Sequence, residues 1–419
     1  GTVRLLGEDP DEGGAVLRER LGVVMDDCGI PEALSLRDMR RILAAGYRTF
    51  EPDKFDALAA RFQLPERKMV KDYSRGMRMK LSLAAALSHD CRLLILDEAT
   101  SGLDPVVRDE ILDLFLEFIQ DEDHSIFVSS HILSDLEKVC DYITFIHGGR
   151  IIFSEEKDTL LEKYVVAKLS DAELRSLDPA KVAGGGAGGA QRGARAGVRP
   201  GGDRGHHALL SEGGAEMKAL MLKDLLCLRQ QAKSVGLVLL VWLVISIATQ
   251  NGQFFCALGV IYVIMLPMMT LSYDERSKWD SRALTMPVTR VQLVLSRYVM
   301  SLLAGLVLCG LGAAVIAVLD GPENVVSSLG FYLLGVLMLA IAMPLMLKLG
   351  VEKARILVAL CYLVPFCLLL LSEKLGLDVV GFLSGLSRPT LVLTAVIAVL
   401  GVPAASVLLS VAIYKKKEF

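Results

Sequence analysis

One apolar run in the sequence reads Arg92-Leu93-Leu94-Ile95-Leu96-Asp97-Glu98 and ends in two acids. A run of this kind fits a strand that is buried on both faces of a parallel sheet. Ligands of such sheets bind at the carboxyl ends of the strands. We therefore expect one of the two acids to hold a water-bound magnesium ion and the other to orient an attacking water. Taken alone, the run fits an ordinary strand end equally well.

Three neighbouring segments extend this pattern. They are Asp72-Tyr73-Ser74-Arg75-Gly76-Met77-Arg78, which precedes a helical apolar pattern from Leu81 to Leu87; Ser101-Gly102-Leu103-Asp104-Pro105; and a predicted strand, Ser125–Ser130, that ends at His131. In this order and spacing the segments resemble the signature loop, Walker B strand, D-loop and switch histidine of ABC ATPases. The resemblance implies an α/β fold of the P-loop NTPase type for the C-terminal part of an ATPase domain, residues 1–165.

The resemblance also implies a role for each matched residue, with ATP and Mg²⁺ as cofactors. Ser74 and Gly76 match the loop that binds the γ-phosphate of ATP held by the opposite subunit, as suits a hydroxyl and backbone N–H groups at a helix N-terminus. The other matches are Asp97 as the magnesium-side acid, Glu98 as the general base, Asp104 as the D-loop contact across the dimer and His131 as the γ-phosphate sensor. Outside this series, His131 fits an ordinary strand-end histidine.

Two segments of the chain depart from the family pattern. In the signature loop, Arg75 and Met77 replace a small residue and an amide. Near the front, Leu21-Gly22-Val23-Val24-Met25-Asp26 resembles the strand that leads into the Q-loop, but Asp26 stands where a glutamine is usual. A carboxylate there can reach magnesium or contact the membrane domain, and an exposed turn acid is the alternative interpretation.

The phosphate loop GxxxxGK[ST], whose backbone amides and lysine cradle phosphates, occurs nowhere in the sequence. Residues Gly1–Gly7 resemble the strand that normally follows that loop and its helix. We therefore expect several dozen residues of the ATPase domain to lie upstream of Gly1. Without them, the chain is expected not to hydrolyse ATP. Residues 31–71 are helical in pattern and match the helical subdomain of the family, which faces the membrane partner.

Charge and composition divide the chain into two parts. Residues 1–216 hold 28 basic and 38 acidic residues, whereas residues 217–419 hold 17 basic and 10 acidic residues among long apolar runs. The second composition is typical of a membrane domain. The first part has no strong basic patch, so nucleic acid is not expected as a partner. None of the eight cysteines forms a CxxC pair, which gives metal and redox motifs no support.

Residues 166–216 are expected to form a tail and a flexible Gly-rich linker. Ten glycines fall within residues 184–205, and such a segment cannot bury enough apolar surface to offset its ordering. Two interpretations stay open. The segment is a real linker, or it is translated out of frame between two proteins normally made separately, in which case Met217 would be the natural start of the second.

The membrane domain, residues 217–419, is expected to contain six transmembrane helices. The apolar stretches lie near residues 235–249, 254–272, 298–319, 325–347, 356–371 and 391–414. Fifteen basic residues fall on one side of these spans and only Lys374 and Arg388 on the other, which places both termini and the ATPase domain in the cytoplasm of a multi-pass protein of the cytoplasmic membrane. A short first stretch leaves a re-entrant pair across 235–272 as an alternative.

The segment from Tyr273 to Arg297 resembles the cytoplasmic loop by which permeases of the drug-exporter class dock onto their ATPase. No span carries a clear buried charge in the sequence, which disfavours a secondary transporter. The resemblance therefore implies an ATP-driven exporter of an amphiphilic peptide or hydrophobic drug-like substrate. Its expected partners are a second copy or a homologous ATPase subunit, membrane lipid and that substrate. The alternative is a non-catalytic permease that works with a separate intact ATPase.

Overall fold

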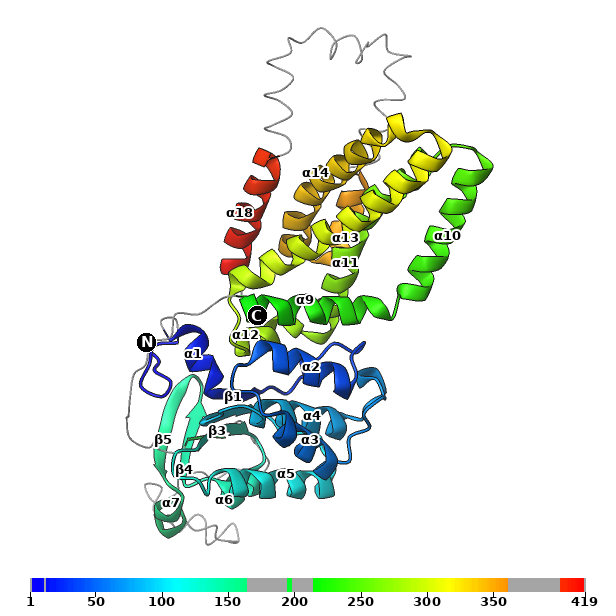
Figure 1. Ribbon diagram of the computed structural model, residues 1–419. Helices are drawn as coiled ribbons and strands as arrows, with labels where there is room; N and C mark the ends of the chain where they lie inside the picture. The colour runs from blue at the N-terminus through cyan, green and yellow to red at the C-terminus, as the bar shows by residue number, and fades with distance from the viewer. Residues whose placement is uncertain (1, 11–12, 164–193, 198–213, 361–399, 418–419) are drawn as a thin grey trace, which may run out of the picture. The chain divides into compact units, whose positions relative to one another are not determined.

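The computed structural model describes residues 2–10, 13–163, 194–197, 214–360 and 400–417 of the chain (Figure 1). The chain divides into two compact units. Unit 1 consists of residues 1–28, 49–64 and 73–209, and unit 2 of residues 29–48, 65–72 and 210–419. The boundary therefore differs from the single boundary that composition suggests, because two short segments from the first part of the sequence belong to unit 2.

A six-stranded mixed sheet forms the centre of unit 1, in the order β1-β2-β3-β6-β4-β5. The strands are β1 (Leu21–Val24), β2 (Leu93–Asp97), β3 (Ser125–Ser130), β4 (Tyr142–His147), β5 (Arg150–Glu156) and β6 (Ala194–Gly197). β2 pairs in parallel with both β1 and β3. Leu94 and Leu96 are buried, so the strand predicted from the apolar run is confirmed.

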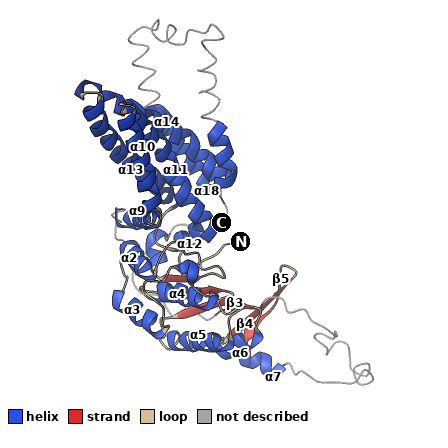
Figure 2. Ribbon diagram, turned by 90° about the vertical axis from the view of Figure 1, so that its right-hand side faces the viewer, coloured by secondary structure: helices blue, strands red, loops and turns tan. Residues whose placement is uncertain are grey.

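Helices of unit 1 accompany this sheet (Figure 2). They are α1 (Gly14–Glu19), α3 (Pro52–Arg61), α4 (Arg75–Leu87), α5 (Pro105–Phe118), α6 (Leu133–Val139) and α7 (Lys157–Lys163). Proline stands at the start of α3 and of α5, where its fixed φ suits a first turn and its missing N–H costs nothing. Leu81 and Leu83 of α4 and Ile111 of α5 are fully buried. The predicted helix from Leu81 to Leu87 is thereby confirmed.

The Gly-rich segment departs from the expected coil at one place. Ala194–Gly197 forms β6, which pairs antiparallel with β3 and with β4. The physical reason is backbone pairing: the facing edges of β3 and β4 each present N–H and C=O groups that need partners. Since β6 consists of Ala194, Arg195, Ala196 and Gly197, the pairing depends on its backbone and needs no apolar side chains.

Unit 2 is helical. Its elements are α2 (Leu36–Gly46), η1 (Val70–Asp72), α9 (Gly214–Arg229), α10 (Ala232–Ala248), α11 (Gln253–Ser277), α12 (Trp279–Thr285), α13 (Arg290–Leu319), η3 (Pro322–Asn324), α14 (Val326–Leu349) and α18 (Val402–Lys415). Capping boxes begin α2, at Ser35 and Asp38, and α13, at Thr289 and Gln292. Each satisfies backbone N–H groups that a helix start leaves without partners.

Three helical segments of the described residues are long and apolar enough to cross a membrane: Gln253–Ser277, Arg290–Leu319 and Pro322–Leu349. The pair Glu216–Arg229 and Ala232–Ala248, bent by 68°, makes a fourth if it counts as one span. These segments match the second, third and fourth predicted spans and include the first. The predicted span near 356–371 lies mostly outside the described residues, and α18 covers only the second half of the predicted span 391–414.

Candidate functional site

The carboxyl ends of β2 and β3 bring Asp97 beside Ser129. Ser129 Oγ donates a hydrogen bond of 2.6 Å to Asp97 Oδ1, and the backbone N–H of Glu98 donates to the same hydroxyl at 3.3 Å. Ser129 therefore positions both acids at the strand edge. Sequence reasoning did not single out Ser129; the available signal was the serine pair that directly precedes His131.

Glu98 leaves the sheet in the left-handed region of the backbone map, with a φ of 53°. A non-glycine residue in this region costs about 1–3 kcal/mol and is found preferentially at functional sites. Two backbone hydrogen bonds hold it, from Glu98 N to Ser129 O at 3.1 Å and from Ser101 N to Glu98 O at 3.0 Å. The resulting turn places Glu98 Oε2 2.6 Å from Nδ1 of His131. Two residues predicted to act at one γ-phosphate are thus in direct contact.

The oxygen donors at this edge fit a magnesium–ATP complex. Asp97 is exposed, and a carboxylate is a preferred Mg²⁺ ligand. In the described ranges, no group of three or more His, Cys, Asp or Glu residues is arranged to hold a metal ion. Proteins usually bind Mg²⁺ through one or two carboxylates together with substrate phosphates and water. The site therefore suits a metal that arrives with nucleotide.

The predicted signature loop lies at the start of α4. Ser74 is the N-cap, and its Oγ accepts the backbone N–H of Met77 at 3.2 Å. A Cβ on Gly76 would lie 3.3 Å from Cγ1 of Val107 in the first turn of α5, so glycine allows the starts of the two helices to approach. Asp104 caps α5 by accepting the backbone N–H of Val107 at 3.0 Å. Helix N-termini of this kind favour anions.

Asp26, at the predicted Q-loop position, forms an ion pair with the guanidinium of Arg75 in the signature loop. Two of the three residues that depart from the family pattern, Asp26 and Arg75, are therefore partners. The described residues contain no hydrogen bond or ion pair that links Ser74, Gly76, Asp104 or Asp26 to Asp97, Glu98 or His131. The structure thus brings the predicted site residues together in two groups.

Unit 2 contains a buried cluster of charges, which we call the five-charge cluster. Its members are Lys223 and Asp224 of α9, Asp274 of α11, Asp280 of α12 and Arg297 of α13, all between 2% and 7% exposed except Asp274, at 1%. Lys223 Nζ lies 2.6 Å from Asp274 Oδ1 and from Asp224 Oδ1. Arg297 Nη2 lies 3.1 Å from Asp274 Oδ2 and 2.5 Å from Asp280 Oδ1.

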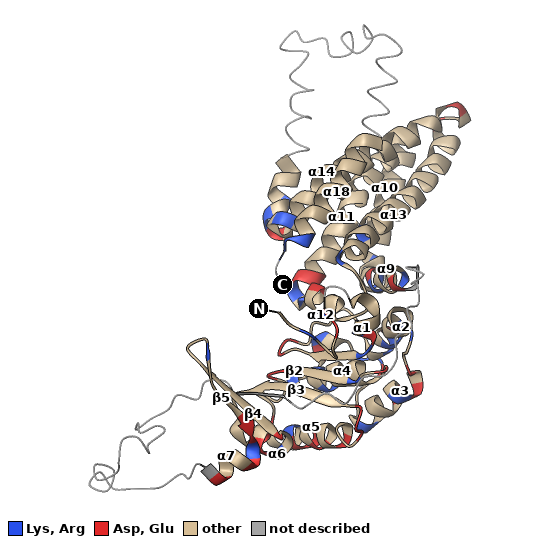
Figure 3. Cartoon of the chain, turned by 90° about the vertical axis from the view of Figure 1, so that its left-hand side faces the viewer, with Lys and Arg blue, Asp and Glu red and all other residues tan. Residues whose placement is uncertain are grey.

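The members of this cluster lie just outside the predicted spans 254–272 and 298–319, so the expectation that no span carries a clear buried charge stays a prediction. Asp274 and Arg297 both belong to helices that are long and apolar enough to span a membrane. The charges escaped sequence reasoning because they lie near the ends of those helices, where exposed charges are common. Figure 3 shows that α10, α11, α13 and α14 carry few charges over most of their length.

Electrostatics explain why the Asp280 carboxylate stays charged. Burial raises the pKa of this carboxyl, but the charge of Arg297, the hydrogen bond from Tyr414 and the charges of Lys417 and Lys223 together outweigh burial and leave that pKa below its usual range. Trp279, fully buried beside this acid in sequence, has its ring centroid 5.4 Å from Lys223 Nζ. Since a buried charge is tolerated only when paired, the cluster fastens α9, α11, α12 and α13 to one another.

The predicted docking loop contacts residues 29–48 inside unit 2. A Cβ on Gly29, whose φ is +66°, would lie 2.8 Å from Cβ of Arg282 in α12. A Cβ on Gly46 would lie 2.6 Å from Cε of Met286. On the neighbouring helix α9, Gln230 Nε2 donates to the carbonyl oxygen of Ala33 at 2.7 Å. Two glycines therefore allow the backbone of this segment to approach α12 and the residue that follows it.

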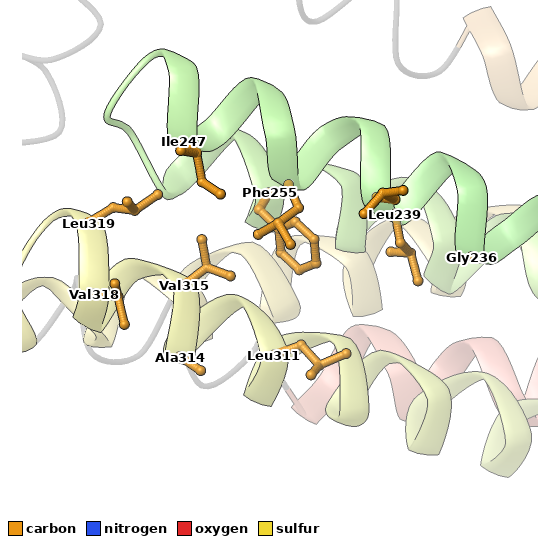
Figure 4. Close-up of a pocket in the computed structure, with 11 residues that line it drawn as sticks. Gly236, Leu239, Ile247, Phe255, Leu311, Ala314, Val315, Val318 and Leu319 are labelled. Carbon is orange, nitrogen blue, oxygen red and sulfur yellow. The ribbon is translucent and has the colours of Figure 1, made fainter.

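An apolar cavity of about 560 Å³ lies among α10, α11 and α13 (Figure 4). Leu239 and Ile247 of α10, Phe255 of α11, and Leu311 and Val315 of α13 point into it. Its lining consists of Gly, Ala, Val, Leu, Ile and Phe, and its volume is in the range of ordinary small-molecule sites, about 300–1,000 Å³.

Comparison with known proteins connects the two groups of features. The ABC transporter family model matches residues 1–101, and the ABC-2 family transporter protein model matches residues 219–415. The bacitracin transport ATP-binding protein BcrA of Enterococcus faecalis is 34% identical over 155 residues, which cover 36% of this chain and 50% of that protein. The lantibiotic transport ATP-binding protein SrtF of Streptococcus pyogenes is 42% identical over 93 residues, covering 22% and 40%.

Among solved structures, that of an ATP-binding subunit of an ABC transporter matches with a TM-score of 0.35 and 24% identity, covering 42% of this chain and 75% of that one. The chain spans half the length of BcrA from Enterococcus faecalis and two fifths of SrtF. Unit 2 adds several apolar helices to the ATPase features of unit 1. The chain is therefore an ABC transporter component in which an ABC transporter ATP-binding region is fused to an ABC-2 family membrane domain.

Proposed function

We propose that this chain is a component of an ATP-driven exporter that moves an amphiphilic peptide or a hydrophobic drug-like molecule across the cytoplasmic membrane. The observation that carries the proposal is the contact between Glu98 and His131 beside Asp97, at the end of β2. It occurs in a chain that also holds an ABC-2 membrane domain. Membrane lipid and a second ATPase domain, from another copy or a homologous subunit, are its partners.

Each residue of the strand edge has a task in this proposal. Mg²⁺–ATP supplies the transferable phosphoryl group and the charge that activates it. Asp97, fixed by Ser129, would hold the metal side of the site. The Glu98 carboxylate would accept the proton of the attacking water, since a general base must lie within hydrogen-bond reach of it. His131, already 2.6 Å from Glu98, would orient that carboxylate and donate to a phosphate oxygen.

The signature loop would act on the nucleotide of the partner ATPase domain. Ser74 and Gly76 stand at the start of α4, and Asp104 caps α5 beside it. Backbone N–H groups at these N-termini favour a phosphate. Asp104 would contact the partner domain across the dimer. Asp26, at the Q-loop position, would lie within reach of the magnesium ion of the nucleotide. The exporter therefore needs two ATPase domains.

Coupling would pass through the docking loop. Gly29 and Gly46 lie against Arg282 and Met286, and the five-charge cluster fastens α12 to α9, α11 and α13. A displacement of residues 29–48 would therefore move the ends of two membrane helices together. The relatives that transport bacitracin and lantibiotic support an amphiphilic peptide as cargo, and the apolar cavity beside Phe255 suits the apolar part of such a molecule.

The decisive experiment removes the proposed general base. Glu98→Gln keeps the shape of the side chain but removes the proton acceptor, so ATP hydrolysis by the transporter, isolated from membranes in its native assembly, should fall by about 10²–10⁴-fold while ATP binding persists. Glu122→Gln, which changes an exposed acid before β3, is the matched control and should hydrolyse ATP normally.

The second candidate function is a permease subunit served by a separate intact ATPase. The observation in its favour is that residues 219–415 match the ABC-2 family transporter protein model by themselves. In that case Glu98→Gln would leave the ATP hydrolysis of the assembly within a factor of two of the parent. The same result would reject the catalytic role of Glu98.

The proposed orientation has its own test. Position 280 is buried at 7% exposure, so a label there would be excluded on either side of the membrane. Arg276 and Glu323 are both exposed and flank the predicted cytoplasmic and outer ends of spans. In intact cells, an impermeant thiol reagent should modify Glu323→Cys and spare Arg276→Cys until the cells are opened. The reverse pattern would contradict the orientation.

A further inference from the structure

The ion pair of Asp26 and Arg75 joins two of the three residues that depart from the family pattern. Their side chains are 52% and 53% exposed. Ion pairs at such exposure are weak, because solvent screens the charges and both side chains lose freedom. The pair therefore holds the guanidinium near the signature loop without fixing it there permanently.

The guanidinium of Arg75 also lies over the D-loop. A Cβ on Gly102 would be 3.2 Å from both Cζ and Nη1 of Arg75. Gly102 itself has a φ of +66°, a conformation that glycine adopts without strain. Arg75 thus joins three loops of unit 1: the Q-loop position, the signature loop and the D-loop.

The charge of Arg75 stands at an unfavourable place for a cation. It is the first residue of α4, and the first turn of that helix holds no acidic residue. The positive end of the helix dipole and the guanidinium together favour an anion. In this structure, the carboxylate of Asp26 supplies that anion.

A phosphate would satisfy Arg75 better than the aspartate does. Guanidinium groups bind phosphate oxygens in a bidentate, charge-assisted manner, and a triphosphate carries more charge than one carboxylate. A nucleotide that reaches the start of α4 would therefore compete with Asp26 for the same guanidinium.

We propose that Asp26 is an exchangeable counter-ion that holds Arg75 until the triphosphate of ATP takes its place, so that Arg75 is a nucleotide-binding residue and Asp26 tunes its availability. The inference rests on the proposed function. It adds Arg75 to the nucleotide site and specifies what Asp26 does there. It also gives a physical reason for an acid at position 26 and a base at position 75, because each charge is the partner of the other.

The test is a double-mutant comparison of the KM for ATP, with the transporter isolated in its native assembly. Asp26→Asn removes the competing charge and should lower KM by about 1.4- to 5-fold, the range expected of an exposed ion pair. Arg75→Gln should raise KM, and Arg75→Lys should recover part of the loss. In Asp26→Asn/Arg75→Gln, KM should equal that of Arg75→Gln alone.

The matched control is Glu117→Gln, which removes the carboxylate of another exposed pair of unit 1, that with Arg61, and should leave KM unchanged. If Asp26→Asn changes the KM for ATP by the same factor in the parent and in Arg75→Gln, the inference is overturned. Asp26 would then act on the nucleotide or its metal directly. If the parent assembly binds no ATP, the proposed function fails and the inference falls with it. If Glu98→Gln abolishes ATP hydrolysis but the KM effects at positions 26 and 75 are independent of each other, the inference is rejected while the proposed function stands.

Discussion

The strand edge of unit 1 and the five-charge cluster of unit 2 use similar side chains in opposite surroundings. At the strand edge, the side chains of Glu98 and His131 are 29% and 46% exposed. In the cluster, Asp274 and Arg297 are 1% and 3% exposed. Exposed charges remain free to meet a ligand, whereas buried charges must satisfy one another. Under the proposed function, the strand edge serves chemistry, whereas the five-charge cluster holds helices together.

Among the residues of the five-charge cluster, Arg297 is the one at which a substitution should cost the most stability. Arg297→Met leaves Asp274 and Asp280 buried without one of their cations, and removal of one partner of a buried ion pair costs about 3–5 kcal/mol. We therefore expect that loss in the free energy of unfolding of unit 2. Unfolding of the full chain in detergent micelles, followed by the fluorescence of the buried Trp279, measures it.

Two further variants make this result specific. Arg276→Met removes an exposed cation of α11 and should change stability by less than about 0.5 kcal/mol. Arg297→Lys keeps a cation near the two acids and should lose less stability than Arg297→Met. Equal stability of Arg297→Met and the parent would show that the cluster does not hold these helices.

At Ser129, on the strand edge, a substitution should change stability little and activity more. Ser129→Ala removes the hydrogen bonds to Asp97 Oδ1 and from Glu98 N, so the stability of unit 1 should fall by only about 0.5–1.5 kcal/mol. ATP hydrolysis should fall by about tenfold or more, because both acids lose a positioning partner and small misplacements are costly in catalysis.

A comparison of kcat with KM separates a positioning role of Ser129 from a role in folding. Ser129→Thr keeps the hydroxyl and should restore much of kcat. Hydrolysis that follows the stability loss in proportion, or that Ser129→Thr fails to improve, would argue that Ser129 has a structural role only.

Secondary structure was predicted correctly where a local pattern of consecutive residues determines it. The strand ending at Asp97, the helix after Ser74 and the strand before His131 were predicted from local patterns, and the structure places them as expected. Prediction failed where a feature depends on distant residues. Asp274 and Arg297 are 23 positions apart on different helices, and neither is unusual at a helix end.

β6 shows the same limit in the sheet. Ala194–Gly197 lacks the alternating apolar pattern by which strands are recognised, and its pairing with β3 and β4 depends on backbone groups. The partnership of Asp26 and Arg75, 49 positions apart, was likewise not visible as a pair. The sequence shows that each of the two residues departs from the family pattern, but it does not show that they contact each other.

A weaker effect is expected at the ion pair of Arg61 and Glu117, which is exposed where the five-charge cluster is buried. Arg61 Nη1 and Nη2 lie 2.5 Å and 2.8 Å from the two oxygens of Glu117, yet the side chains are 40% and 52% exposed. The hydrogen bond from Arg61 lowers the pKa of the Glu117 carboxyl. Because solvent screens the pair, Glu117→Gln should cost at most about 0.2–1 kcal/mol at neutral pH.

The sign of its pH dependence follows from that lowered pKa. The stabilisation is fully present above the unfolded pKa of glutamate, about 4.3, and is lost as the pH falls through the lower folded value, because the carboxylate then takes up a proton in both states. Hydrogen exchange of α3 and α5 amides in the parent and in Glu117→Gln should therefore differ slightly at pH 6, and the difference should shrink as the pH falls below the pKa of the folded-state carboxyl. A difference in hydrogen exchange that grows on acidification would contradict this sign. A stability loss as large as that expected for Arg297→Met would show that pair geometry, and not burial, sets the strength of these ion pairs.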